Sequence, residues 1–454
     1  MKIVLVLALS FFTTVASAEE LRFSLYKIQS GKPGPTLLVI GGIQGDEPGG
    51  FTAASMLVTN YSVTTGNIWV VPNLNFESII RRSRGVHGDM NRKFKTLSEN
   101  DPEFDEVQKI KQIILDKNVN VVLNLHDGSG FYTEKYIDKW RNPNRWGQCI
   151  IIDQETLDVP EYGKLINIAT KVQQHVNQQL DSKGQHFYIK NTETRKGDVE
   201  MEKSLTYFSI RHQRPAFAVE ASKHFQTHER TYYHLLAVEG FLNTLGVKFK
   251  RNFKLTKRGV AAQIGSNLNI SLYGNRVNLS VEEARPLLNY VPLKKKAPLK
   301  YKKSNPLIAV FGDKNRLQVQ YGNRYVTSLN PQYFEYDYDL DSIKMQVDGE
   351  DKIINIGEKI SVKKSFKVLA ENEYRVNVIG YTRHGVVNEN GLLIKRESIK
   401  PAYSIDKNEN IFRVELYKGD KFSGMILIDF DGTENTRQPA ELQESYSMNS
   451  QQML

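Results

Sequence analysis

Five short apolar runs rich in Val, Ile and Leu alternate with helical patterns over the first half of the chain: 36–40, 68–71, 119–125, 149–152 and 216–219. Short runs in which apolar residues predominate are typical of strands buried on both faces of a sheet. Between them, apolar residues recur at helical spacing in 107–114 and 165–176, and a last helix is predicted over 231–245 before Gly246. This alternation predicts an α/β sandwich with a mixed central sheet, which would bind ligands beyond the carboxyl ends of its strands.

The pattern changes after about residue 250, where short alternating strands are separated by Gly-Asn and Gly-Asp turns. We therefore predict an α/β domain over 19–248, followed by two small all-β domains over 249–337 and 338–432. The last is expected to be an immunoglobulin-like β-sandwich. The polar residues 433–454, rich in Gln, Ser and Glu, predict a disordered tail.

The N-terminus has the features of a secretory signal peptide. Lys2 precedes an apolar run over 3–15, and the small residues 16–18 supply a cleavage site after Ala18. The run is shorter than the roughly 20 residues that cross a bilayer. We expect an exported mature protein that begins near Glu19. Its single cysteine, Cys149, lies in an apolar run and is expected to be a buried strand thiol.

The formal net charge of +10 makes the chain moderately basic, with a lysine-rich segment over 294–303. Nucleic acid is not expected as a partner of an exported protein. An anionic cell-wall polymer or lipid headgroups fit this charge, whereas a solvated lysine-rich linker is the structural alternative.

Two oxygen-bearing side chains follow the first apolar run. The segment Gly41-Gly42-Ile43-Gln44-Gly45-Asp46-Glu47 turns sharply at the strand end, and its Gln44 and Glu47 lie three residues apart. One turn of chain would direct both side chains to the same point, where they could share a metal ion. An ordinary strand-to-helix turn is the alternative.

Two further strand ends carry a histidine and a carboxylate. His126 closes the run 119–125 and completes three protein ligands, the number that a catalytic zinc needs when its fourth position stays open. A lone strand-end histidine is more often structural. Glu220 follows the run 216–219, where burial of a carboxylate is costly unless it has a partner or a role.

An arginine-rich loop over 81–94 lies between these motifs and contains Arg84, Asn91 and Arg92. Guanidinium groups bind carboxylates through two parallel hydrogen bonds. A solvated basic loop is the alternative, but three polar loops at three strand ends favour one shared site.

In their order and context, these motifs resemble those of the M14 metallocarboxypeptidases over about residues 20–245. Gln44 departs from that pattern, because the family normally has histidine as its first zinc ligand. This substitution is similar to that of the cell-shape-determining DL-carboxypeptidases of helical and curved Gram-negative bacteria. Those proteins also have a signal peptide and two extra β-domains.

The resemblance implies one zinc ion held by Gln44, Glu47 and His126. It also implies that Glu220 activates water and protonates the leaving amine, and that Arg84 stabilises the oxyanion. A terminal carboxylate of the substrate would be anchored by Asn91 and Arg92. The pocket is further expected to include Trp146, Thr206 and Tyr207, although packing is the alternative role for the last two.

The implied enzyme is periplasmic and releases meso-diaminopimelate from the peptidoglycan tripeptide L-Ala-γ-D-Glu-meso-diaminopimelate, thereby influencing cell shape. Its β-domains would contact cell-wall polymer or partner proteins. A neutral amide binds zinc more weakly than imidazole, so Gln44 either tunes an active site or marks a decayed one. A non-catalytic wall-binding scaffold and an aspartoacylase-like deacylase remain open alternatives.

Overall fold

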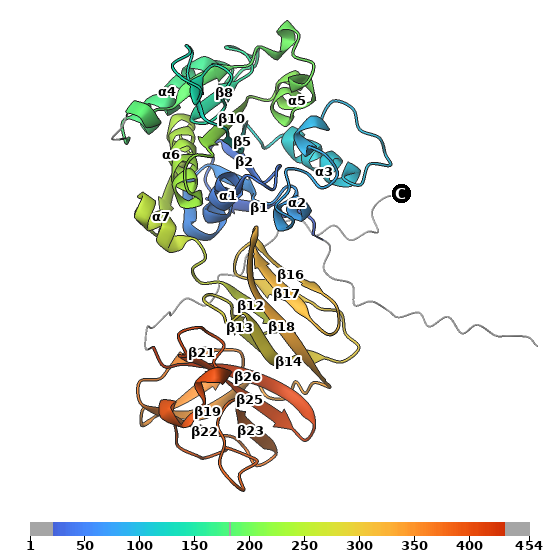
Figure 1. Ribbon diagram of the computed structural model, residues 1–454, viewed down its shortest axis with the longest axis vertical. Coiled ribbons are helices and arrows are strands. Elements are labelled where there is room, and N and C mark those ends of the chain that lie inside the picture. The colour runs from blue at the N-terminus through green and yellow to red at the C-terminus, as the bar shows by residue number, and fades with distance from the viewer. Residues whose placement is uncertain (1–20, 181–182, 432–454) are drawn as a thin grey trace, which may run out of the picture.

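The computed structural model of the chain describes residues 21–180 and 183–431 (Figure 1). The predicted signal peptide and polar tail lie outside these residues. Within the described part of the chain, no helix has the length and apolar character needed to cross a membrane.

A seven-stranded mixed sheet forms the centre of the first domain. Its order is β1 (Tyr26–Gln29), β4 (Asn67–Val71), β2 (Thr36–Gly41), β5 (Val121–Gly128), β10 (Ala216–Ser222), β8 (Cys149–Ile152) and β9 (Tyr188–Asn191). The four strands from β4 to β10 are parallel, whereas β1 and β8 run antiparallel to β4 and β10. All residues of β2, β5, β8 and β10 are buried, which confirms the interpretation of the apolar runs.

Helices cover both faces of this sheet (Figure 1). On one side, α6 (Thr227–Leu245) packs against α1 (Pro48–Asn60) and α4 (Leu165–Asn177). The other side carries α2 (Phe76–Ile80), α3 (Phe104–Leu115) and α5 (Leu205–Arg211). Helix α6 ends at Gly246 as predicted, with a left-handed φ of 84°. It begins four residues before the predicted start, because Gln226 and Glu229 form a capping box around a polar first turn that lacks the apolar spacing.

The packed core of this domain continues beyond residue 248. Strand β11 (Lys248–Arg251) pairs with β3 (Tyr61–Thr65), and α7 (Lys257–Gln263) packs on α6. Val260 of α7 is fully buried in the same hydrophobic core. The boundary predicted at 248 therefore falls within β11, ahead of residues that still pack on the α/β domain.

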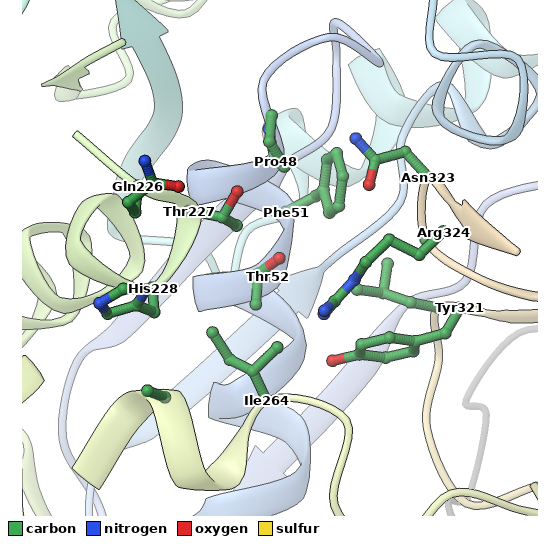
Figure 2. Close-up of a pocket in the computed structure, with 13 residues that line it drawn as sticks. Pro48, Phe51, Thr52, Gln226, Thr227, His228, Ile264, Tyr321, Asn323 and Arg324 are labelled. Carbon is green, nitrogen blue, oxygen red and sulfur yellow. The ribbon is translucent and has the colours of Figure 1, made fainter. Parts of the chain in front are cut away.

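The first β-domain contains two sheets. One has the order β13 (Val277–Ser280), β12 (Asn269–Leu272), β15 (Tyr301–Lys303), and the other β14 (Leu287–Lys294), β18 (Arg324–Phe334), β17 (Leu317–Tyr321), β16 (Ile308–Gly312). Its hydrophobic cluster includes Phe51 and Phe76 of the α/β domain, so the two domains share apolar contacts. A cavity of about 300 Å³ lies between them, with Pro48 and Thr52 on one wall and Tyr321 and Arg324 on another (Figure 2).

The second β-domain is a sandwich of two four-stranded sheets around its own core. The sheets are β20 (Glu350–Asn355), β19 (Ser342–Val347), β22 (Ser365–Leu369), β24 (Ile394–Lys395) and β21 (Lys359–Ser361), β26 (Lys421–Asp429), β25 (Ile411–Lys418), β23 (Tyr374–Val378). An α/β sandwich with a mixed sheet followed by two small all-β domains is thus the confirmed fold.

One buried carboxylate joins three elements of the α/β domain. Asp127 on β5 accepts a hydrogen bond from the backbone N–H of Gly49 in α1 at 2.8 Å. It also accepts from Arg230 at 2.6 Å and contacts His234 Nε2 at 3.0 Å, both on α6. Gly49 permits this approach, since a Cβ there would lie 2.4 Å from Asp127 Oδ1. Asp127 consequently fixes the start of α1 against the end of β5.

We predict that Asp127→Ala lowers the free energy of unfolding by about 3–5 kcal/mol, because it leaves the Arg230 charge, the buried His234 ring and the backbone N–H of Gly49 without their shared partner. Urea denaturation followed by circular dichroism measures this loss. Asp351→Ala is the matched control, since Asp351 pairs with Lys344 at the surface, and it should leave the midpoint nearly unchanged. Equal effects of the two variants would contradict the assigned role.

Candidate functional site

The structure brings all ten predicted site residues to one cavity of about 260 Å³, which we call the polar pocket. It lies along the carboxyl ends of β5 and β10 and continues beside β8. Its lining includes Gln44, Glu47, Arg84, Asn91, Arg92, His126, Trp146, Thr206, Tyr207 and Glu220. The sequence motifs from separate strand ends therefore share one site.

Three of these side chains converge on one point. His126 Nδ1 lies 3.0 Å from Gln44 Oε1 and 2.9 Å from Glu47 Oε2. The glutamate is held by the backbone N–H of Asp127, which donates to Oε2 at 3.1 Å. All three side chains are buried. Gln44 Oε1 and Glu47 Oε2 thus both lie within hydrogen-bond distance of the same nitrogen, His126 Nδ1.

Asp89 determines which end of the Gln44 amide points to His126. Gln44 Nε2 donates to Asp89 Oδ1 at 2.8 Å. Because an ionised carboxylate only accepts hydrogen bonds, the NH₂ group must face Asp89 and the carbonyl oxygen must face His126. Asp89 remains ionised, since the Gln44 hydrogen bond and the Arg84 charge outweigh burial and hold its pKa below the usual value. The amide oxygen is therefore presented as a ligand.

The surroundings of His126 fit a metal ion bound at Nδ1. Two acceptor oxygens face that nitrogen, which carries at most one proton, so a cation would satisfy both. On the other side of the ring, Asn124 Nδ2 lies 2.7 Å from Nε2, and Asn124 Oδ1 has no hydrogen-bond partner among the described residues. If the Asn124 amide is turned by 180°, its Oδ1 accepts a hydrogen bond from the Nε2–H of His126. A metal-bound histidine usually donates its other ring N–H in this way.

The donor set is imidazole, carboxylate and amide, and it fits a divalent cation with one position left open. No three His, Cys, Asp or Glu side chains form such a group within the described ranges. The donor set here does not count as such a group because its third member is the amide of Gln44. Burial opposes protonation of His126, but the hydrogen bond to Glu47 and the charges of Glu47 and Glu220 raise its pKa, which indicates a site built to hold positive charge.

Glu220 lies beside this donor set. It is the register partner of His126 in the parallel β10–β5 pair, which places both side chains on the same face of the sheet. Its exposure is 9%, and burial with the nearby charges of Glu47 and Asp127 raises its pKa to about 8 despite the opposing charge of His126. A carboxyl group that exchanges a proton near neutral pH is suited to general acid and base chemistry.

Basic side chains line the other side of the polar pocket. Arg84 Nη2 lies 2.9 Å from Asp89, and its Nη1 lies 3.4 Å from Glu47. Asn91 accepts from the backbone N–H of Leu205 at 2.9 Å, which joins the arginine-rich loop to α5. Thr206 and Tyr207 on α5 line the pocket, as does Arg92.

Sequence reasoning missed several residues of this site. Asp89 orients Gln44, Asp127 holds Glu47 through its backbone, and Lys223 lies 3.6 Å from Glu47. Asp127 and Lys223 could have been suspected, because they lie one and three residues after His126 and Glu220. Asp153 and Thr192 also line the pocket and had no nearby motif to mark them.

An α/β sandwich with this donor set at its strand ends defines a metallohydrolase. A family model described as the catalytic part of carboxypeptidases controlling helical cell shape, peptidase M99, matches residues 1–265. A second model, described as the C-terminal domain of metallo-carboxypeptidase, matches residues 336–431. The chain belongs to this family of carboxypeptidases that control helical cell shape. The predicted resemblance is confirmed, and a deacylase is not the better account.

The chain is similar to cell shape determinant protein Csd4 from Helicobacter pylori. The apo structure of that protein is 38% identical, with a TM-score of 0.82 over 90% of this chain and 99% of that chain. Its tripeptide-bound structure is 38% identical, with a TM-score of 0.81 over 90% of this chain and 99% of that chain. Its mDAP-bound form, described as that of a D,L-carboxypeptidase, is 39% identical. The TM-score is 0.82, over 89% of this chain and 99% of that chain. No curated protein sequence matches the chain.

Without metal, we expect Glu220→Gln to be more heat-stable than the wild type at high pH. The folded pKa of Glu220 is raised from 4.5 to about 8, so the folded state holds its proton more tightly and wild-type stability falls as pH rises between these values. The glutamine variant does not titrate. Thermal unfolding in chelator should therefore show a difference in midpoint that widens from pH 4.5 to pH 8.

Glu99→Gln, at an exposed surface carboxylate, is the control for this experiment and should show no such widening. A difference between Glu220→Gln and wild type that is the same at every pH would refute the raised pKa.

Proposed function

We propose that this chain is a periplasmic zinc D,L-carboxypeptidase that removes meso-diaminopimelate from the tripeptide L-Ala-γ-D-Glu-meso-diaminopimelate. The observation that carries the proposal is that Gln44 Oε1 and Glu47 Oε2 lie 3.0 and 2.9 Å from His126 Nδ1, beside Glu220. Arginines for a terminal carboxylate lie in the same pocket. The tripeptide-bound and mDAP-bound structures of the similar Helicobacter pylori protein support this choice of substrate.

Zinc is the metal that fits this donor set best. Imidazole suits zinc, and three protein ligands with an open position are typical of catalytic zinc sites. When bound, zinc supplies Lewis acidity, which lets water react as a nucleophile near neutral pH. The amide of Gln44 contributes no charge, so Glu47 is the only anionic ligand.

Glu220 is the proposed general base and acid. Its carboxylate takes a proton from the attacking water and then delivers that proton to the leaving amine of diaminopimelate. A pKa of about 8 in the metal-free site lies near the working pH, where such transfers are most effective. A bound cation would lower this value and favour the basic form at the start of the reaction.

The basic side chains are assigned to the charges of substrate and transition state. Arg84 is half exposed and reaches Glu47 from the solvent side, so its guanidinium can donate to the oxygen that becomes negative at the scissile carbonyl. Asn91 and Arg92 line the pocket beside it and are assigned to the terminal carboxylate. Together they explain why the enzyme would act at a chain end.

Two observations favour an enzyme over a decayed scaffold. Asp89 holds the Gln44 amide with its oxygen toward His126, an orientation that serves a ligand and has no packing purpose. Glu220 also keeps a buried carboxyl beside that point, where a non-catalytic protein would gain stability from an apolar residue. The buried Glu220 carboxyl costs stability unless the site works.

The periplasmic assignment rests on the sequence of residues 1–18 and on the role of the family in controlling cell shape. Docking of the β-domains to cell-wall polymer or partner proteins remains a hypothesis. The lysine-rich segment 294–303 begins in β14 and ends in β15, so its charges are carried by the folded first β-domain.

We expect Glu220→Gln to lower kcat for the tripeptide by about 10²- to 10⁴-fold, the usual contribution of a general acid–base group. Chromatography with mass spectrometry would follow the release of diaminopimelate, and the zinc content of each protein would be measured in parallel. Glu350→Gln, an exposed carboxylate in β20, is the control and should retain full activity. Unchanged turnover by Glu220→Gln, or by chelated wild type, would contradict the mechanism.

We expect Arg92→Ala to raise KM for the tripeptide by about 10- to 100-fold, because the substrate carboxylate loses a charged hydrogen-bond donor. The wild type should discriminate strongly against the same tripeptide carrying a C-terminal amide. Steady-state kinetics on both substrates would measure the two ratios. If Arg92→Ala preserved the preference for the free acid, another residue would have to hold the carboxylate.

A further inference from the structure

A second buried carboxylate lines the polar pocket, away from the predicted metal ligands. Asp153 follows β8 directly and is 3% exposed. Its Oδ1 accepts hydrogen bonds from the hydroxyls of Thr192, at 3.0 Å, and Thr194. Its Oδ2 has no hydrogen-bond partner among the described residues. A buried carboxylate oxygen without a donor carries an uncompensated desolvation cost.

A purely structural role explains only half of this side chain. The two threonine hydroxyls bind Oδ1 and shape the turn after β9, and a neutral asparagine oxygen would serve them equally well. The unpaired Oδ2 instead provides a negative acceptor in a pocket whose opposite side is basic. An ammonium group is the donor that such an oxygen fits best.

The floor of the pocket leads from Glu220 to this carboxylate. In the antiparallel β10–β8 pair, Glu220 is the partner of Cys149, and Ala218 is the partner of Ile151. Since directly paired residues share one face of a sheet and side chains alternate along a strand, Asp153 lies on the same face, two residues beyond Ile151.

This floor is apolar. Cys149, Ile151 and Ala218 form a small hydrophobic cluster against which Tyr132 and Trp146 pack. Asp153 is four residues beyond Cys149 along β8, which corresponds to about 13 Å at the usual rise per residue. The pocket therefore presents a catalytic end, an apolar middle and a carboxylate at its far end.

From this arrangement we infer that Asp153 is a specificity-determining residue that binds the distal ammonium group of the released diaminopimelate residue. The methylene chain of that residue lies over Ile151 and Ala218, and its ammonium donates to Asp153 Oδ2. This assignment rests on the proposed function, which places the backbone end of the same residue at Arg92 and Glu220.

Binding of two free amino acids tests the assignment without any turnover. meso-Diaminopimelate and L-2-aminopimelate have the same chain and the same two carboxylates, and only the former carries the distal ammonium. Titration calorimetry on the zinc-loaded, full-length protein should give about 10- to 100-fold tighter binding of diaminopimelate to the wild type. Asp153→Asn should reduce this preference to nearly one.

Thr194→Val is the matched control, because it removes one hydroxyl from Oδ1 and leaves the Asp153 charge in place. It should retain the preference for diaminopimelate. Thermal unfolding would show whether each variant is folded, and Asp153→Ser replaces the asparagine variant if the latter is not.

The outcomes separate this inference from the proposed function. A wild type that binds both amino acids equally, or a folded Asp153→Asn variant that keeps the full preference, overturns the role of Asp153 while the proposed enzyme stands. A wild type that binds neither amino acid overturns the substrate itself, and the role of Asp153 with it.

Discussion

The site depends on the buried carboxylate of Asp127. Its two oxygens hold the first turn of α1 and two side chains of α6, while its backbone N–H donates to Glu47. Gln44 and Glu47 come just before α1, and His126 comes just before Asp127. The residue that joins these elements therefore also sets the distance between the donors, so fold stability and donor geometry cannot be varied independently.

A second chain of contacts compensates for the unusual ligand. An amide can present either its oxygen or its NH₂ group, and the hydrogen bond to Asp89 fixes which of the two faces His126. Asp89 is in turn paired with Arg84, which also contacts Glu47. The oxygen presented to the metal, the acid that orients it and the arginine beside the reacting carbonyl consequently form one network.

The sequence predicted the parts of this molecule that periodicity and strand ends determine. Apolar runs located the central strands because burial on both faces favours apolar residues, and the strand-end positions of His126 and Glu220 located the site. Asp89 and Asp153 could not be assigned in this way. Their partners, Gln44 and Thr192, lie 45 and 39 residues away along the chain, and only tertiary packing brings them together.

Other differences have the same origin. The polar first turn of α6 carries no apolar signal, and α7, which packs on α6, lies after the change in sequence pattern near residue 250.

Asp153 shows why such residues matter. A carboxylate that stays unpaired until a substrate binds costs stability in the free protein, yet it rejects any analogue that leaves it unpaired. The pocket thus trades some folding free energy for discrimination, and its basic and acidic ends orient one substrate residue in a single direction.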